Sequence, residues 1–452
     1  MIRAVFLTHT AAPSGAELAT LRLLSALEGR ARHIGARRVA ASGGAFDSGV
    51  VEDRVPGGDA VVHGEGVDSA GPGGAARGGG ASEDNAPGGE LDGGAAHDAA
   101  AVRVSMLLTE HGPLVELLRA RGIPVTVCGN DFDSRSLTIA GAGPLRLIGG
   151  AFELIRLGRR LGEYVRAEDA DVLVAGSSKA LLMGAVAARR ARVPLVWQVH
   201  DRIAGEYFGT VLAVLLRLLG WVLARGVVAN SHATLATLYT RGRVAAVAYP
   251  GVEDTATGER APQRAPGDVR IVLVGRLTPW KGHAVLLRAL PLLRRPPAAV
   301  TLVGGTFFGE QDHRRELERA AAGLAVPVEF TGHVEDPGAY LRAGDIAVHC
   351  SVTAEPFGQV VVEAMRAGCA VVAADAGGPT EIVRHDVDGL LVTPGDPAAL
   401  AAALDRLIAD PALRTRLAEA GMRRSGDFSI EETARVVTAL LRTVTGKQGG
   451  AR

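Results

Sequence analysis

Short apolar runs alternate with longer stretches of helical spacing along most of the chain. Several short runs, such as 244–248 and 370–373, are continuously apolar, which is typical of parallel strands covered on both faces. Strands are predicted at 2–7, 102–108, 123–127, 171–175, 194–199, 227–229, 244–248, 269–274, 299–303, 327–330, 346–349, 370–373 and 390–392. Helices are predicted at 17–27, 113–121, 144–166, 178–190, 209–224, 232–241, 281–293, 310–323, 337–343 and 379–384, with helical pattern over 396–442. This alternation predicts an α/β fold.

Residues 249–268 interrupt the alternation with a stretch rich in proline, glycine, threonine and charge, which is typical of a connection between domains. The pattern therefore predicts two doubly wound Rossmann-like domains that face each other across a cleft. We expect an N-terminal domain over 1–249, a second domain over 250–428, and a terminal helix and tail over 429–452.

Residues 43–100 carry no sustained periodicity and contain seventeen glycines. Such a composition buries too little apolar surface to offset the entropy of ordering, so it predicts a disordered insert. The insert holds eleven acidic residues and two arginines, which leaves 47 basic and 38 acidic residues for the rest of the chain, a net of +9. That remainder suits an anionic ligand or an anionic membrane surface.

The whole chain balances 49 lysines and arginines against 49 acidic residues, which argues against a nucleic-acid partner. Three cysteines, Cys128, Cys350 and Cys369, form neither a metal-ligand spacing nor a disulfide framework, as expected of a cytoplasmic protein. The apolar window 211–224 has two interpretations, a buried or half-buried helix, which is favoured, and a helix on a membrane surface. Peripheral contact with the inner face of the membrane therefore stays open.

The most informative motif places two carboxylates, Glu355 and Glu363, eight residues apart. Glu355 follows the predicted strand 346–349, and Glu363 lies about two turns into the next helix, so the two lie on the order of 10 Å apart along the axis. This span suits a long polar ligand held at both ends, with a negatively charged middle over the helix N-terminus. A nucleoside diphosphate sugar has that shape.

Two cations, Arg276 and Lys281, follow the first strand of the second domain, at the same sheet edge as Glu355. A diphosphate held between them would be a stabilised leaving group. His200 ends the strand 194–199 and should point into the cleft from the first domain. Gly15 follows the first strand and would let the backbone approach a ligand. Alone, each of these residues also has an ordinary structural interpretation, as a surface cation, a core histidine or a helix-start glycine.

Other chemistries fit poorly. The chain has no H-E-x-x-H, no Walker A sequence and no G-x-S-x-G elbow. It also lacks a D-x-D pair within a predicted ordered segment, so we expect no metal site and no cofactor. A nicotinamide dehydrogenase is disfavoured because G-x-G-x-x-G is absent.

These motifs together resemble the retaining glycosyltransferases of the GT-B fold, the large family 4 or group 1 type. The resemblance rests on Glu355-Pro356-Phe357-Gly358 with Glu363, Val274-Gly275-Arg276-Leu277 with Lys281-Gly282, Gly377-Gly378 with Glu381-Ile382-Val383, and Asp388-Gly389-Leu390-Leu391-Val392. Weaker matches are Gly15-Ala16-Glu17, His200-Asp201 and Ala229-Asn230-Ser231. It covers nearly the whole chain outside residues 30–100.

The resemblance implies a role for each site residue. Glu363 would bind the ribose, Arg276 and Lys281 would clamp the diphosphate, and the backbone near Val334 would adjoin the base. Glu355 and His200 would meet the donor sugar, the first with the amides of Phe357, Gly358 and Gln359. The Gly15 loop would adjoin the phosphate and the acceptor, and the final helix would pack back on the first domain. Such enzymes need no metal.

The sequence therefore predicts a metal-independent retaining hexosyltransferase that uses a nucleoside diphosphate sugar as co-substrate. The acceptor hydroxyl could belong to a glycan, a lipid-linked molecule or a small molecule such as a sugar, and the family points to glycans of the cell envelope. The alternative from another class is a catalytically silent protein that binds nucleotide sugars.

Overall fold

A computed structural model describes residues 1–12, 14–41, 102–129, 144–253, 264–306 and 309–447. The predicted insert at 43–100 lies outside the described residues. Residues 1–34 and 100–452 form one compact unit, and residues 35–99 form another, of which the structure describes only the end of helix α1.

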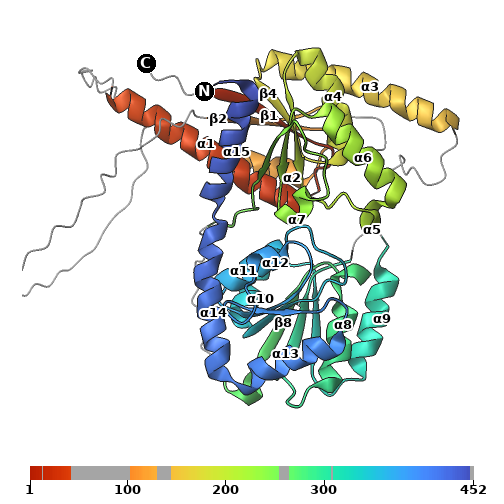
Figure 1. Cartoon of the computed structure of the whole chain (residues 1–452), viewed down its shortest axis with the longest axis vertical. Helices are drawn as coiled ribbons and strands as arrows, with labels where there is room; N and C mark the ends of the chain where they lie inside the picture. Colours follow the sequence, from red (N-terminus) through yellow and green to blue (C-terminus); the bar gives the residue numbers. More distant parts are fainter. Residues whose placement is uncertain (13, 42–101, 130–143, 254–263, 307–308, 448–452) are drawn as a thin grey trace, which may run out of the picture. The chain divides into compact units, whose positions relative to one another are not determined.

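Two parallel sheets organise the described part of the large unit (Figure 1). The first sheet has the order β3-β2-β1-β4-β5-β6-β7 and the second has the order β10-β9-β8-β11-β12-β13. The first comprises β1 Ile2–Thr8, β2 Val102–Leu108, β3 Val125–Val127, β4 Val172–Ala175, β5 Leu195–Val199, β6 Gly226–Ala229 and β7 Val244–Val247. The second comprises β8 Arg270–Val274, β9 Ala299–Val303, β10 Val328–Gly332, β11 Ile346–His349, β12 Ala370–Ala374 and β13 Leu390–Val392. The expected doubly wound α/β class is confirmed.

Helices cover both faces of each sheet, and we call each sheet with its helices a lobe. The first lobe holds α1 Gly15–Ala41, α2 Pro113–Ala120, α3 Pro144–Ala167, α4 Ser178–Ala191, α5 Gly205–Phe208, α6 Thr210–Leu223 and α7 His232–Leu235. The second holds α8 His283–Ala289, α9 Gln311–Ala322, α10 Pro337–Ala343, α11 Gln359–Arg366, α12 Pro379–Ile382, α13 Pro397–Ala409 and α14 Pro411–Ser425. Short 3-10 turns lie at η2 Pro266–Asp268, η3 Pro279–Lys281, η4 Leu290–Leu292 and η5 Gly426–Phe428.

Alternate residues of the central strands point into different cores. In β1, Phe6 packs with α1 and α2, whereas Leu7 packs with α3, α4 and α6. In β8, Leu273 joins the core under α8 and α13, whereas Val272 joins the core under α10 and α11. The last helix, α15 Ile430–Thr445, buries Ile430, Ala434, Val437, Leu441 and Val444 in a core of the first lobe. Helix α15 thus returns to the sheet that contains β1 (Figure 1).

Element boundaries differ from the prediction in two helices of the first lobe. Helix α1 continues to Ala41 instead of ending at Leu27, since the alanines and arginines that follow favour helix even without an apolar period. The helix predicted at 232–241 ends at Leu235. There the Thr237 hydroxyl donates to the Thr234 carbonyl at 2.7 Å, a local bond that competes with helix continuation.

Each sheet has one point where the winding direction reverses, and ligands bind outside such points in open α/β sheets. In the first sheet it lies between β1 and β4, and in the second between β8 and β11. The Gly15 loop follows β1, the segment with Arg276 follows β8, and Glu355 follows β11. The fold therefore brings three of the predicted site segments to reversal points.

Gly220 allows helix α6 to pack closely against the first sheet. A Cβ atom on Gly220 would lie 2.2 Å from the Trp197 ring, and Trp197 is only 1% exposed. We therefore expect Gly220→Ala to lower the unfolding free energy by about 1–3 kcal/mol through overpacking, although alanine favours helix. The matched control is Gly29→Ala in α1, where nothing lies within 4 Å. Urea unfolding should show that the control is neutral or stabilising by up to about 1 kcal/mol, and equal effects of the two variants would contradict the packing argument.

Candidate active site

Loops after the carboxyl ends of both sets of strands enclose a cavity of about 540 Å³. The first lobe contributes Ser14, Gly15, Ala16, Ala19, His200, Asp201, Glu206, Tyr207, Asn230 and Pro250. The second contributes Arg276, Trp280, Thr353, Glu355, Pro356, Phe357, Gly358 and Gln359. Seven of the predicted site residues therefore line one cavity: Gly15, His200, Arg276, Glu355, Phe357, Gly358 and Gln359.

Glu355 is only 8% exposed, and three side chains contact its carboxylate. Lys281 Nζ donates to its Oε1 at 2.7 Å, and the Ser351 hydroxyl donates to its Oε2 at 2.8 Å. His349 Nε2 lies 3.3 Å from the same Oε2. Burial alone would raise the pKa of Glu355, but the Lys281 charge and the bonds from His349 and Lys281 outweigh it and hold the pKa well below its usual range. Glu355 is therefore a fixed anion.

Lys281 reaches this carboxylate from the turn after β8. The turn ends at Gly282, which has φ +77°, and a Cβ there would lie 1.9 Å from the carbonyl oxygen of Cys350. Only glycine lets the turn approach the end of β11 this closely. Lys281 Nζ also lies 4.3 Å from the centre of the Trp280 ring. The ammonium is thus positioned by a carboxylate and an aromatic face, and it approaches the cavity through Glu355 instead of lining the wall itself.

Arg276 does line the cavity, and its side chain is 37% exposed. Its Nε lies 4.0 Å from Glu310 Oε2, a contact too long for a hydrogen bond. Of the two predicted cations, Arg276 thus lines the cavity, and Lys281 contacts it through Glu355.

The loop after Glu355 leads directly into helix α11. Gly358 has φ +95°, which favours glycine, and its Cβ would approach the Pro379 ring to 3.1 Å. Phe357, Gly358 and Gln359 present the N-terminal end of α11 to the cavity. The positive end of the helix dipole therefore faces the same space as Arg276.

Glu363 lies farther along α11 and does not line the cavity. Its Oε1 accepts from Gln359 Nε2 at 2.8 Å and lies 3.5 Å from an Arg22 nitrogen of the first lobe. Burial raises the pKa of Glu363, and Arg22 and Gln359 offset part of that effect. Val334, which follows β10, is half-buried and also lies outside the cavity wall. The structure thus leaves these two predicted residues outside the cavity wall.

His200 and Gly15 both face the cavity from the first lobe. Asn230 Nδ2 donates to the His200 carbonyl at 2.8 Å, which fixes the backbone. His200 Nε2 is buried and has no hydrogen-bond partner among the described residues. Burial lowers the pKa of His200 to about 4, so the imidazole is neutral at pH 7. Nothing lies within 4 Å of a Cβ on Gly15, so the structure leaves open space there.

Several residues of the site gave little signal in the sequence. Tyr207 lies on α5, a single turn that no pattern predicted, and its hydroxyl donates to the Ala354 carbonyl at 2.5 Å. The rings of Tyr207 and Trp280 meet edge to face, 6.3 Å apart. His349 could have been found as a strand-end histidine, and Arg22 as the residue two helical turns after Gly15. Their contacts to Glu355 and Glu363 become visible only in three dimensions.

Glu381 joins the lobes through backbone amides. Its carboxylate accepts from the His232 and Ala233 amides at 2.9 and 2.7 Å and from the Tyr249 hydroxyl at 2.9 Å. Burial and, to a lesser extent, the hydrogen bond to Glu381 raise the pKa of Tyr249 to about 12.

Two hydroxyls of the first lobe reach the loop that follows Glu355. Ser231 and Thr234 both donate to the carbonyl of Pro356. The loop that carries Phe357 and Gly358 is therefore held by the first lobe as well as by its own.

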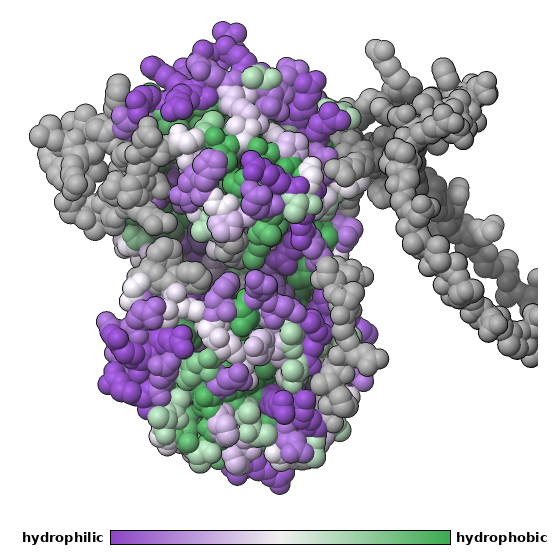
Figure 2. Space-filling model, turned by 180° about the vertical axis from the view of Figure 1, so that it is seen from behind, coloured by the Kyte–Doolittle hydropathy of each residue, from purple (hydrophilic) through white to green (hydrophobic). Residues whose placement is uncertain are grey.

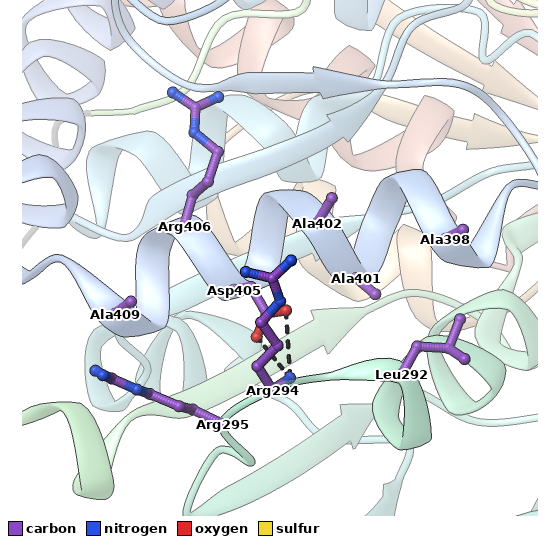
Figure 3. Close-up of a pocket in the computed structure, with 9 residues that line it drawn as sticks. All are labelled: Leu292, Arg294, Arg295, Ala398, Ala401, Ala402, Asp405, Arg406 and Ala409. Atoms are coloured by element: carbon purple, nitrogen blue, oxygen red, sulfur yellow. Dashed lines mark hydrogen bonds between the residues drawn. The ribbon is translucent and has the colours of Figure 1, made fainter.

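A second hollow, of about 730 Å³, lies on the outside of the second lobe between η4 and α13 (Figure 3). It is lined by Leu292, Arg294, Arg295, Ala398, Ala401, Ala402, Asp405, Arg406 and Ala409. The Arg294 amide donates to Asp405, as the dashed lines show. None of the predicted site residues lies there, so the cavity at the strand ends is the candidate active site.

Comparisons with known proteins agree with this assignment. Residues 256–424 match the family described as glycosyl transferases group 1, and residues 113–256 match glycosyltransferase family 4. The lipopolysaccharide core biosynthesis glycosyltransferase LpsD of Rhizobium meliloti (strain 1021) is 32% identical over 292 residues, 60% of this chain and 76% of that protein. The D-inositol 3-phosphate glycosyltransferase of Salinispora arenicola (strain CNS-205) is 39% identical over 175 residues, 36% of this chain and 38% of that protein.

The fold also has solved counterparts. The crystal structure of Anabaena Alr3699/HepE in complex with UDP and glucose has a TM-score of 0.69 and covers 98% of this chain and 100% of that one, at 24% identity. At that identity the likeness shows the fold alone. Together with the relatives of higher identity, the matches confirm the family that the motifs predicted: this chain belongs to the group 1 glycosyltransferases of family 4, enzymes with the two-lobed GT-B architecture.

Proposed function

We propose that this glycosyltransferase moves a hexose from a nucleoside diphosphate sugar to an acceptor hydroxyl, with retention of the anomeric configuration and without a metal ion. The observation that carries the proposal is the cavity that brings Arg276 and the N-terminus of α11 together with buried Glu355, which Lys281 holds in place. Arg276 and the helix N-terminus supply positive charge at the wall, and Lys281 lies next to it, which suits the pyrophosphate of an activated sugar.

In this proposal the cations do the work that a metal does elsewhere. Arg276 and Lys281 neutralise the diphosphate, and the amides near Phe357 and Gly358 hold its oxygens. As the sugar–oxygen bond breaks, negative charge grows on the phosphate oxygen, and fixed cations stabilise that charge without rearranging. Glu363 and Arg22, next to each other on the two lobes, would bind the ribose, and the backbone near Val334 would adjoin the base.

Retention is proposed to proceed on one face of the sugar. The acceptor oxygen forms its bond to the anomeric carbon as the bond to phosphate breaks, and the departing phosphate oxygen takes the acceptor proton. Glu355 is a poor candidate for a nucleophile because both of its oxygens are already engaged. It would instead accept hydrogen bonds from donor-sugar hydroxyls, with neutral His200 opposite it.

Relatives suggest which substrates to test first. One solved structure of Anabaena Alr3699/HepE holds UDP-glucose, and LpsD is named for lipopolysaccharide core biosynthesis. We therefore propose UDP-glucose as the first donor and a sugar, a glycan or a lipid-linked sugar of the cell envelope as acceptor. Peripheral contact with a membrane belongs to the same proposal.

The proposal is tested with a panel of UDP-, GDP- and ADP-sugars. We expect one donor to stabilise the protein by about 2.7 kcal/mol at a hundredfold its dissociation constant. The same donor should be turned over with or without EDTA at rates within about twofold. Donor binding without hydrolysis or transfer would instead favour a silent binding protein, and a strict need for a divalent ion would end the metal-free mechanism.

Lys281→Ala should slow transfer by about a hundredfold or more, because a fixed charge at a leaving group contributes about 3 kcal/mol. Lys281→Arg should recover part of the rate, since it keeps the charge. Arg288→Ala, on an exposed position of α8, serves as the control and should keep the wild-type rate. Wild-type kcat in Lys281→Ala, with its fold verified by circular dichroism, would remove Lys281 from the clamp.

Neutral His200 should make the fold sensitive to mild acid. Its pKa is about 4 in the native chain and about 6.5 when unfolded, so the unfolded chain binds more protons below pH 6.5. This contribution to stability is complete above pH 6.5 and is lost as the pH falls toward 4. Between pH 6 and pH 5 the unfolding free energy should fall about 1 kcal/mol further in the wild type than in His200→Asn. Urea titrations at both pH values measure this, and equal losses would refute a neutral buried imidazole.

A further inference from the structure

Apart from Thr210 and Arg217, helix α6 consists of apolar residues and one glycine, but only one side of it is buried. Ala213, Leu216 and Gly220 face the first sheet. On the other side, Val211 is 84% exposed and Val222 is 55% exposed, and Val214, Leu215, Leu218 and Trp221 lie between 38% and 47%. These positions recur at intervals of three and four, so they form one continuous stripe. A helix that is apolar on all sides is normally covered on all sides.

The stripe differs from the ordinary apolar surface of the protein. Figure 2 shows another face, on which apolar residues lie in patches between hydrophilic clusters, as on most soluble proteins. Among the described residues, fifteen large hydrophobic side chains are exposed, and six of them stand on α6. Such concentration on one short helix marks an interaction surface.

Within the segment 207–252, which carries the stripe, all charged residues have a single sign. Residues 207–252 contain no aspartate or glutamate, and they include Arg217, Arg225, Arg241 and Arg243. Trp221 lies at the C-terminal end of the stripe, where its Nε1 donates to the Arg241 carbonyl at 2.9 Å. The Arg243 guanidinium lies 5.5 Å from the centre of the Trp221 ring. Aromatic rings beside arginines are typical of the headgroup region of an anionic bilayer.

We propose that the stripe on α6 docks the protein on an anionic lipid bilayer, with the helix lying in the plane of the interface. Fourteen residues are too few to cross a membrane, and no helix in the described part of the chain has the length and apolar character to do so. A second copy of the chain is the competing occupant, and the oligomeric state decides between the two.

Docking through α6 would place the bilayer next to the candidate active site. Gly209 alone separates α6 from α5, where Glu206 and Tyr207 line the cavity. A lipid-linked acceptor could then enter without leaving the interface, and this consequence alone rests on the proposed function. The docking itself stands on the stripe and its charges.

The test uses the full chain and sedimentation with vesicles. Wild-type protein should bind vesicles of phosphatidylglycerol and phosphatidylethanolamine at least tenfold more strongly than vesicles of phosphatidylcholine. The double variant Leu215→Glu, Leu218→Glu should lose at least tenfold in binding to the anionic vesicles. The control is Leu292→Glu, on the outer surface of the second lobe (Figure 3). Leu292 is 54% exposed and also lies near arginines, but it is not part of the stripe.

Equal binding by wild type and double variant would overturn the proposal, as would an equal loss in the control. Analytical ultracentrifugation supplies another arm: a wild-type dimer that the double variant abolishes would assign the stripe to a second copy instead. Thermal shift with UDP-glucose is measured on every protein. If the double variant still responds to UDP-glucose but no longer binds vesicles, the docking proposal is supported. If none of the proteins responds to UDP-glucose, the donor assignment fails, and the docking proposal is judged separately by the vesicle binding.

Discussion

The second-lobe side of the cavity depends on one buried carboxylate. Glu355 ties together the turn after β8 through Lys281, the end of β11 through His349 and Ser351, and the loop that starts α11. Removing one partner of a buried ion pair leaves a charge without compensation, which commonly destabilises a protein by about 3–5 kcal/mol. The same bonds fix Lys281 and leave the carboxylate with little freedom, so the electrostatics of the site are set before any ligand arrives.

The position of the cavity follows from the two parallel sheets. In each sheet the chain reverses its winding direction once, and the loops that leave the strands at that point diverge and open a crevice. Contacts between the lobes then fix the crevice walls. Glu381 binds the first turn of α7, and Ser231 with Thr234 binds the carbonyl of Pro356. The loop that presents the α11 amides is therefore shaped by residues of both lobes.

A short segment of the first lobe carries both a polar residue of the cavity wall and the exposed apolar stripe of α6. Tyr207 contributes to the cavity wall and bonds the Ala354 carbonyl of the second lobe, and α6 begins only a few residues later with its exposed stripe. Both features sit on the same connection, after the strand that carries His200. In the proposed reaction, such an arrangement would let a donor from water and an acceptor in a membrane meet close to the proposed docking surface.

The sequence by itself determined the α/β class, nearly every strand, and the motif residues at the reversal points, because strand periodicity and strand-end glycines are local properties. It also indicated that 211–224 is unusually apolar, and it favoured a buried or half-buried helix. Tertiary structure alone decided which side of this helix is exposed, since burial depends on which side meets the sheet at Gly220. Likewise only the fold could bring His349, Ser351 and Lys281 to Glu355, or Arg22 to Glu363, because such contacts join residues whose spacing along the chain carries no pattern.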